Sequence, residues 1–109
     1  MAILNAQKVV IGGLQPTYAA AAGGGDQAPV GEKLLLIVRN GDATSKTVTL
    51  ATPGTVGDLA VADAVQAIPA SGTAMFALKA SAFRDPVTGR AAITYSAVTS
   101  VTVAVVQLP

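Results

Sequence analysis

The segment that decides the fold is AAITYSAVTSVTVAVVQLP at residues 91–109, which contains no charged residue. Within it, apolar side chains recur at every second position: Ile93, Tyr95, Val101, Val103 and Val105. Successive side chains of an extended strand point to opposite faces, so these residues share one face while Thr102 and Ala104 lie on the other. A period of two is typical of a half-buried β-strand. The segment therefore predicts strands at 91–97 and 100–108, each with one face in a core.

Similar patterns indicate strands elsewhere in the chain. Residues 32–39 (EKLLLIVR) are apolar on both faces, as in a central strand that is covered on each side. Residues 46–52 alternate, with Val48 and Leu50 inward, and residues 73–78 form another apolar run. Turn signals separate these runs, at Asn40-Gly41-Asp42, Pro53-Gly54, residues 68–72 and residues 85–89.

Residues 55–70 (TVGDLAVADAVQAIPA) leave two interpretations open. They fit short strands around 59–61 and 65–68, or an Ala-rich helical turn at 60–65. The whole chain then contains about seven short strands with turn signals roughly every 8–12 residues, which is typical of all-β domains. We predict an antiparallel β-sandwich or barrel, jelly-roll or Ig-like, with little helix.

The N-terminal region differs from the rest of the chain. Residues 1–13 contain two runs of large aliphatic residues, Ile3-Leu4 and Val9-Val10-Ile11. This segment fits either an extended arm or a first strand. Residues 14–31 contain four successive Ala and three successive Gly, and glycine loses the most backbone freedom on ordering, which predicts a mobile or irregular loop. The predicted organisation is one domain, with an N-terminal arm and flexible Ala/Gly-rich loop at 1–31 and a β-sandwich core at 32–109.

The composition favours assembly over catalysis. Only 12% of the residues are charged, against about 25% in an average soluble domain, whereas 51% are hydrophobic. A small domain has much surface to cover, so we expect part of this surface to be buried against a partner. The seven basic and six acidic residues are scattered and give a net charge of +1, which disfavours binding to nucleic acid.

Membrane insertion and secretion are also disfavoured. Ser, Thr and Gln interrupt the apolar C-terminal segment. The N-terminus, MAILNAQKVVIGG, lacks the basic region and the continuous apolar region of a secretory signal. The absence of Cys makes no case for an oxidising compartment. We therefore expect synthesis in the cytoplasm and no contact with a membrane.

The chain lacks the usual side chains of catalysis, because it has no His and no Cys. No base is placed beside a nucleophilic Ser or Thr, so we assign no catalytic residue and predict no enzyme. The run Gly23-Gly24-Gly25-Asp26 is not followed by Lys-Ser/Thr and is not a phosphate-binding loop. Some acidic residues could meet in space, but their spacing matches no calcium loop, and we expect turn carboxylates with no metal or cofactor: Asp42, Asp58, Asp63 and Asp85.

The chain has four aromatic residues. Phe76 and Tyr95 lie in predicted strands and are expected in the core, and Phe83 is expected to close one end of the sandwich. Tyr18 lies in the Gly-rich loop, where it either folds back onto its own domain or inserts into a neighbouring molecule. With the apolar N-terminal residues it gives the candidate interface: Ile3, Leu4, Val9, Val10, Ile11 and Tyr18.

Taken together, several segments carry a resemblance to a known class of proteins. They are the loop around Pro16-Thr17-Tyr18, LLLIVRNGDATSKTVTL, IPASGTAMFAL, the turn at Phe83-Arg84-Asp85 and ITYSAVTSVTVAVVQL. In this pattern, which extends over most of residues 1–109 and has no invariant motif, the chain resembles small β-sandwich virion proteins of tailed bacteriophages. It is most similar to a capsid decoration (cement) protein.

The resemblance implies a structural protein that binds the outside of the phage head and stabilises it. The implied partner is the major capsid protein, and the implied association is a homo-oligomer, often a trimer, with a terminal arm that contacts adjoining subunits. The implied location is the capsid surface of the virion, after synthesis in the host cytoplasm. Two alternatives stay open: another phage virion component of the tail, neck or fibre, and a non-viral β-sandwich binding module.

Overall fold

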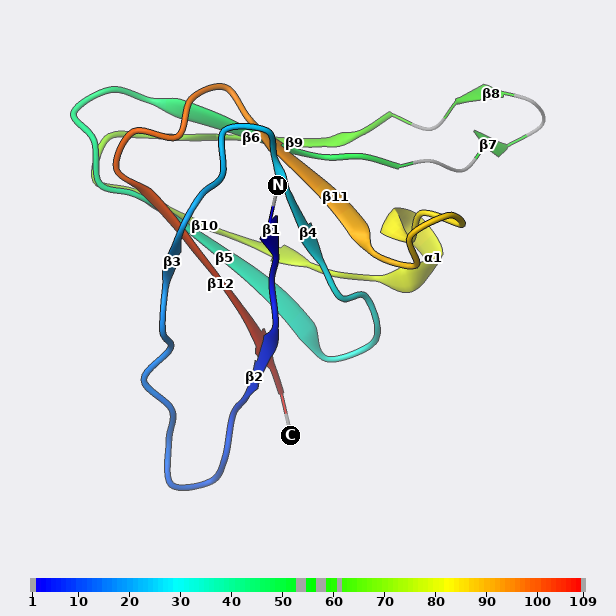
Figure 1. The fold of residues 1–109 in the computed structure, drawn as a ribbon, viewed down its shortest axis with the longest axis horizontal. Coiled ribbons are helices and arrows are strands. Elements are labelled where there is room, and N and C mark those ends of the chain that lie inside the picture. The colour runs from blue at the N-terminus through cyan, green and yellow to red at the C-terminus, as the bar shows by residue number, and fades with distance from the viewer. Residues whose placement is uncertain (1, 53–54, 57–58, 61, 109) are drawn as a thin grey trace.

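A computed structural model describes residues 2–52, 55–56, 59–60 and 62–108 (Figure 1). Twelve strands and one short helix are found in these residues. The strands form two five-stranded sheets, which pack face to face, and a separate two-stranded hairpin. Strand formation follows the alternating pattern of the sequence, because each sheet buries one face against the other.

The first sheet is built around its two longest strands. Its members are β10 (Thr73–Ala77), β5 (Leu34–Asn40), β12 (Val101–Gln107), β2 (Ala6–Lys8) and β3 (Ala19–Ala20). β5 and β12 are antiparallel along their whole length, from Leu34 opposite Gln107 to Asn40 opposite Val101. On the other side of β12, β2 pairs in parallel with one half and β3 pairs antiparallel with the other half.

The second sheet covers the first. Its strand order is β1 (Ala2–Ile3), β4 (Asp26–Ala28), β11 (Ala91–Tyr95), β6 (Lys46–Leu50) and β9 (Ala64–Ile68). Between β6 and β9 the chain continues away from the sheets as the small hairpin of β7 (Thr55–Val56) and β8 (Leu59–Ala60), at the upper right of Figure 1.

The antiparallel pairs are nested along the chain. β3 pairs with β12, β4 with β11, β5 with β10 and β6 with β9. Rolling this nested ribbon brings β12 beside β5 and β11 beside β6, which gives the orders β3-β12-β5-β10 and β4-β11-β6-β9. These eight strands form a jelly roll, and β1 and β2 add one parallel strand to each sheet. The all-β prediction is confirmed, and the strand order is jelly-roll, not Ig-like.

The core lies between the sheets and contains the residues that the alternation predicts. Six of them are at most 1% exposed: Val48, Leu50, Ile93, Val101, Val103 and Val105. Leu36 and Val38 of β5 are fully buried beside them. Phe76, Phe83 and Tyr95 are partly buried and pack against this cluster. The inward faces predicted for β6, β11 and β12 are therefore confirmed.

Residues 1–31 do not form the separate arm and loop that the sequence predicts. Of the two interpretations of residues 1–13, the first strand holds for residues 2–8, which form β1 and β2. Leu4 lies in the crossover between the two sheets, is 9% exposed, and donates its N–H to the carbonyl of Gln27 at 2.7 Å. β3 and β4 also belong to the sheets, so no boundary falls at residue 31.

The uncertain segment at 55–70 contains strands in its described residues. Ala60 is in β8, and β9 begins at Ala64, while the predicted turn at Pro53-Gly54 and Val61 of the helical alternative lie outside the described residues.

A single helical turn, α1 (Ala80–Phe83), precedes β11. No helix in the described part of the chain is long and apolar enough to span a membrane.

Candidate functional site

The structure separates the six predicted interface residues. Leu4 faces the core, which corrects its assignment to an interface, because β1 and β2 bring it between the sheets. Ile3 is 54% exposed at the end of β1. Val9 is half-buried and donates its N–H to the carbonyl of Gln107 at 2.8 Å, so it extends the pairing of β2. Val10 and Ile11 remain exposed together, and Tyr18 lies at a separate site.

Val10 and Ile11 belong to the loop at residues 9–18, which connects β2 to β3 and projects beyond the sheets at the bottom of Figure 1. The side chain of Gln7 closes the base of this loop. Its Nε2 donates to the carbonyl of Thr17 at 2.8 Å, and its Oε1 accepts the N–H of Thr17 at 2.8 Å. One side chain therefore takes the place of a backbone pair between the two arms of the loop.

The end of the loop presents apolar side chains to solvent. Gly13 donates its N–H to the carbonyl of Val10 at 2.9 Å and has a φ of 99°, in the left-handed region that glycine favours. This turn leaves Val10 54%, Ile11 104% and Leu14 36% exposed. We call Val10, Ile11 and Leu14 the apolar tip. Burying such a side chain is worth roughly 1.5–3 kcal/mol, so the tip has the chemistry of a docking element.

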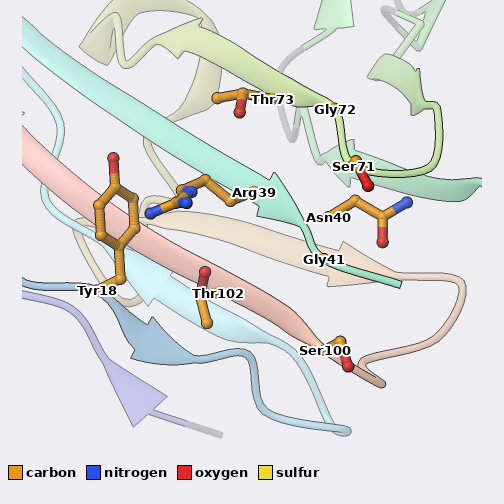
Figure 2. A pocket seen from close by; sticks show the side chains of 9 residues that line it. All are labelled: Tyr18, Arg39, Asn40, Gly41, Ser71, Gly72, Thr73, Ser100 and Thr102. Carbon is orange, nitrogen blue, oxygen red and sulfur yellow. The ribbon is translucent and has the colours of Figure 1, made fainter. Parts of the chain in front are cut away.

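A cavity of about 630 Å³ opens on the outer face of the first sheet (Figure 2). Arg39 of β5 points to this face because its neighbours Val38 and Asn40 are buried. Thr73 of β10 and Thr102 of β12 lie directly opposite Arg39 in the strand register. The three residues therefore form a row across three adjacent strands, with a threonine on each side of Arg39.

Tyr18 forms one wall of this cavity. The guanidinium carbon of Arg39 lies 4.9 Å from the centre of the Tyr18 ring, the distance of a cation–π contact (Figure 2). Tyr18 thus folds back onto its own domain, but onto the outer face of a sheet instead of the core. In the described residues the ion pair present is Lys46–Asp42, and no acidic side chain lines the cavity. The charge of Arg39 is therefore uncompensated there.

The rim of the cavity is fixed by a buried amide. Asn40, 1% exposed, donates from Nδ2 to the carbonyls of Thr44 at 2.8 Å, Ile68 at 3.1 Å and Pro69 at 3.2 Å. Its Oδ1 accepts the N–H of Asp42 at 3.0 Å. One side chain thereby ties the β5–β6 turn to the β9–β10 turn, and this arrangement was not visible in the sequence beyond the turn signal at Asn40-Gly41.

The backbone at the rim is also closely packed. Ser71 and Ser100, which line the cavity, have φ angles of 59° and 57°, in the left-handed region that non-glycine residues rarely occupy. A Cβ on Gly72 would lie 2.9 Å from Pro69, and one on Gly41 would lie 3.1 Å from the carbonyl oxygen of Ser100. Residues held in such conformations are often found at functional sites, and here Ser71 and Ser100 line the same cavity.

The acidic residues considered for metal binding accept hydrogen bonds from backbone N–H groups. Asp42 accepts from Lys46 Nζ at 2.8 Å and from the N–H of Ala43, and these hydrogen bonds hold the pKa of Asp42 below its usual value. Asp63 accepts the N–H of Thr52 at 2.9 Å, and Asp85 accepts that of Val87 at 2.8 Å. Asp58 lies outside the described residues. Within those residues no three metal-ligating side chains lie together.

Comparisons of the chain with models of protein families, with curated proteins and with solved structures gave no significant match. Two surface features of this fold therefore bear on function: the apolar tip and the Arg39 cavity.

Proposed function

We propose that this chain is a structural virion protein that binds the outer surface of a bacteriophage capsid and stabilises it, as a decoration protein. The observation that carries the proposal is the apolar tip, where three apolar side chains are presented on a loop that Gln7 closes at its base. A loop with this shape can insert into a groove of a larger surface without rearrangement of the sandwich.

Composition supports the same proposal. The segment 9–18 (VVIGGLQPTY) contains no charged residue, in a chain with only 12% charge. Exposed apolar groups that lie together usually mark a surface for another protein. The proposed partner is the major capsid protein, and association of the chain with itself, as a trimer on the head, is part of the proposal. No catalytic step, cofactor or nucleic acid enters it.

The structure changes which part of the N-terminal region we propose for contact. Residues 2–8 are paired in the sheets and Leu4 is in the core, so deleting residues 1–13 would remove strands and disturb folding. The proposed contact is therefore the apolar tip, with Ile3 as a second exposed apolar residue. A jelly roll is found in viral capsid proteins and also in lectins, so the fold agrees with the proposal without deciding it.

The test is reconstitution on phage particles that lack the protein. Purified wild-type chain and Ile11→Asp are added to the particles, and occupancy is measured by cryo-electron microscopy. Val87→Asp is the matched control, because Val87 is 91% exposed in the unrelated turn between α1 and β11. We expect head density for the wild type and for the control, and loss of density for Ile11→Asp.

Other results would contradict the proposal in distinct ways. Density on the tail, neck or fibres would overturn head decoration and would support the alternative that the chain is another virion component. Absence of wild-type density from the particle would overturn the virion assignment. Full occupancy of the head by Ile11→Asp would overturn the role of the apolar tip.

A further inference from the structure

We propose that the cavity around Arg39 is a receptor for a carboxylate, supplied by an Asp or Glu side chain on the protein surface that this chain binds. The inference rests on the proposed function for its partner, but the carboxylate chemistry can be measured without that partner. It assigns a second, polar contact to a chain whose apolar tip supplies the first.

The first argument is charge. Arg39 is exposed in the centre of a sheet, and within the described residues it has no ion-pair partner. The remaining lining is neutral and includes the hydroxyl residues Ser71, Thr73, Ser100 and Thr102. An anion that enters the cavity therefore meets one cation and several hydrogen-bond donors, and no carboxylate of this chain competes with it.

The second argument is geometry. Tyr18 contacts the guanidinium of Arg39 at a centroid distance of 4.9 Å, which restricts the rotamers of a long side chain before any ligand binds. Thr73 and Thr102 flank Arg39 in register, one on each neighbouring strand (Figure 2). A planar guanidinium matches a planar carboxylate through two parallel N–H···O bonds, and each neighbouring hydroxyl can donate to a remaining lone pair.

The third argument is rigidity. Backbone hydrogen bonds of 2.9 Å from Asn40 to Gly72 and from Gly41 to Ser100 join the turns that form the rim. The left-handed conformations of Ser71 and Ser100 occur within the same turns. A site that is already ordered loses less entropy when it binds, so a small ligand group can be held there.

These features favour a protein carboxylate over two other anions. A phosphate dianion is usually held by several cations or backbone N–H groups, and the cavity supplies one guanidinium. An acidic sugar would need an aromatic face for its ring, and Tyr18, the single aromatic residue in the lining, already has Arg39 over one face of its ring. An Asp or Glu side chain needs neither feature.

The first experiment measures carboxylate binding by the isolated chain. The peptide acetyl-Gly-Glu-Gly-amide is titrated while backbone amide resonances are followed by NMR, with acetyl-Gly-Gln-Gly-amide, galacturonic acid and inorganic phosphate as competing probes. We expect saturable shifts at Arg39, Thr73 and Thr102 with the Glu peptide, weaker binding of galacturonic acid and phosphate, and no shifts with the Gln peptide.

Variants then assign the binding to the cavity. Arg39→Gln removes the charged fork and should weaken binding of the Glu peptide at least about tenfold. Thr102→Val keeps the shape and strand propensity but removes one hydroxyl, and should weaken binding about two- to tenfold. Arg84→Gln is the matched control, an exposed arginine beyond α1 that does not line the cavity, and should leave binding unchanged.

The proposal is overturned if the Glu peptide gives no saturable shifts, or if Arg39→Gln binds it as well as the wild type does. It is also overturned if galacturonic acid or phosphate binds more tightly than the Glu peptide. On particles, we expect Arg39→Gln to lower occupancy. If the Glu peptide binds but Ile11→Asp decorates the head fully, the tip proposal fails and the carboxylate site stands. If the Glu peptide does not bind but Ile11→Asp no longer binds to the head, the carboxylate site fails and the tip proposal stands.

Discussion

Two glycine-containing connections in the N-terminal region look alike in sequence and differ completely in the fold. The loop at 9–18 contains Gly12-Gly13, and a Cβ added to either glycine would meet no atom within 4 Å. The turn at 21–25 ends in Gly25, where a Cβ would lie 2.6 Å from the carbonyl oxygen of Ile93. The first connection presents apolar side chains to solvent, and the second is packed against the sheet.

The difference arises from the residue that comes directly after each glycine run. After Gly25 comes Asp26, a fully buried carboxylate that accepts the N–H of Ala22 at 3.3 Å and the hydroxyl of Tyr95 at 2.7 Å. Gly13 is followed instead by Leu14, an apolar residue that is 36% exposed, and the loop is closed by Gln7 at its base. One buried polar residue can therefore decide whether a glycine-rich turn belongs to the core or to the surface.

The largest effect on this contrast is expected at Gly25. We expect Gly25→Ala to destabilise the protein by roughly 2–5 kcal/mol, because the φ of 95° is unfavourable for Ala and the new methyl would overlap a backbone oxygen. Denaturation with urea measures the change. The control is Gly23→Ala in the same run, where the methyl meets nothing within 4 Å and the effect should stay within about 0.5 kcal/mol. Equal effects at the two positions would show that the turn is not packed as described.

The anchor itself is tested at Tyr95. Tyr95→Phe removes the hydroxyl that donates to buried Asp26 and should cost about 1–3 kcal/mol, the range for a buried acceptor that loses a hydrogen-bond partner. The control is Tyr18→Phe, since the Tyr18 hydroxyl makes no hydrogen bond in the described part of the chain, and its stability should be unchanged. If Tyr95→Phe left the free energy of unfolding unchanged, the stabilising role of the Tyr95–Asp26 hydrogen bond would be contradicted.

The same pair predicts a dependence on pH. Burial and the hydrogen bond to Asp26 raise the pKa of Tyr95 above its ordinary value of 10.0. The folded protein therefore favours the protonated phenol, so this contribution to stability is complete below the unfolded pKa and is lost as pH rises above it. Urea denaturation between about pH 9 and about pH 11 should show falling stability, and Tyr95→Phe should remove that part of the slope.

A smaller loss of stability is expected when the base of the loop at 9–18 is opened at Gln7. Gln7→Ala removes two exposed hydrogen bonds and should lower global stability by about 1 kcal/mol or less. Amide exchange at Thr17 should nevertheless accelerate, because its N–H loses its acceptor. Gln15→Ala, an exposed change within the same loop, is the control. Unchanged exchange at Thr17 would mean that another contact closes the loop.

The smallest effect is expected at the apolar tip. Ile11→Asp should change the free energy of unfolding by less than about 0.5 kcal/mol, because the side chain is fully exposed. Thermal denaturation beside Val87→Asp checks this value. A large loss of stability would show that Ile11 packs within its own chain and is not available to a partner.

Strand positions could be predicted from the sequence where one face of a strand is buried, because burial imposes a period of two. Val48, Leu50 and Val103 follow this period and lie in the core. The short strands β1 to β4 leave no such signal, since two or three residues cannot show a period. β2, β3 and β4 pair with β11 or β12, far along the chain, and β1 pairs with β4.

The candidate site was predictable only in part. Val10 and Ile11 were identified from their apolar character, and Leu14 of the same tip was missed because it falls at the start of the irregular loop predicted for residues 14–31. The Arg39 cavity could not be predicted, since Thr73, Arg39 and Thr102 are separated by about thirty residues or more and meet through the register of three strands. Leu4, assigned to the interface, is in the core because the chain crosses between sheets there.

The nested order of the strands has a consequence for how the chain reaches its fold. β3 pairs with β12 and β4 pairs with β11, so the strands near residues 20 and 27 can pair only with segments near residues 103 and 92, far along the chain. Contacts between such distant segments slow folding, because a long loop must close before any pairing rewards it. We therefore expect the β6–β9 hairpin to form first, the ribbon to zip outward from it, and the N-terminal strands to dock last. Until these strands pair, the uncharged segment 9–18 stays exposed on an unfolded part of the chain. We expect the protein to be most prone to aggregation at this stage of folding.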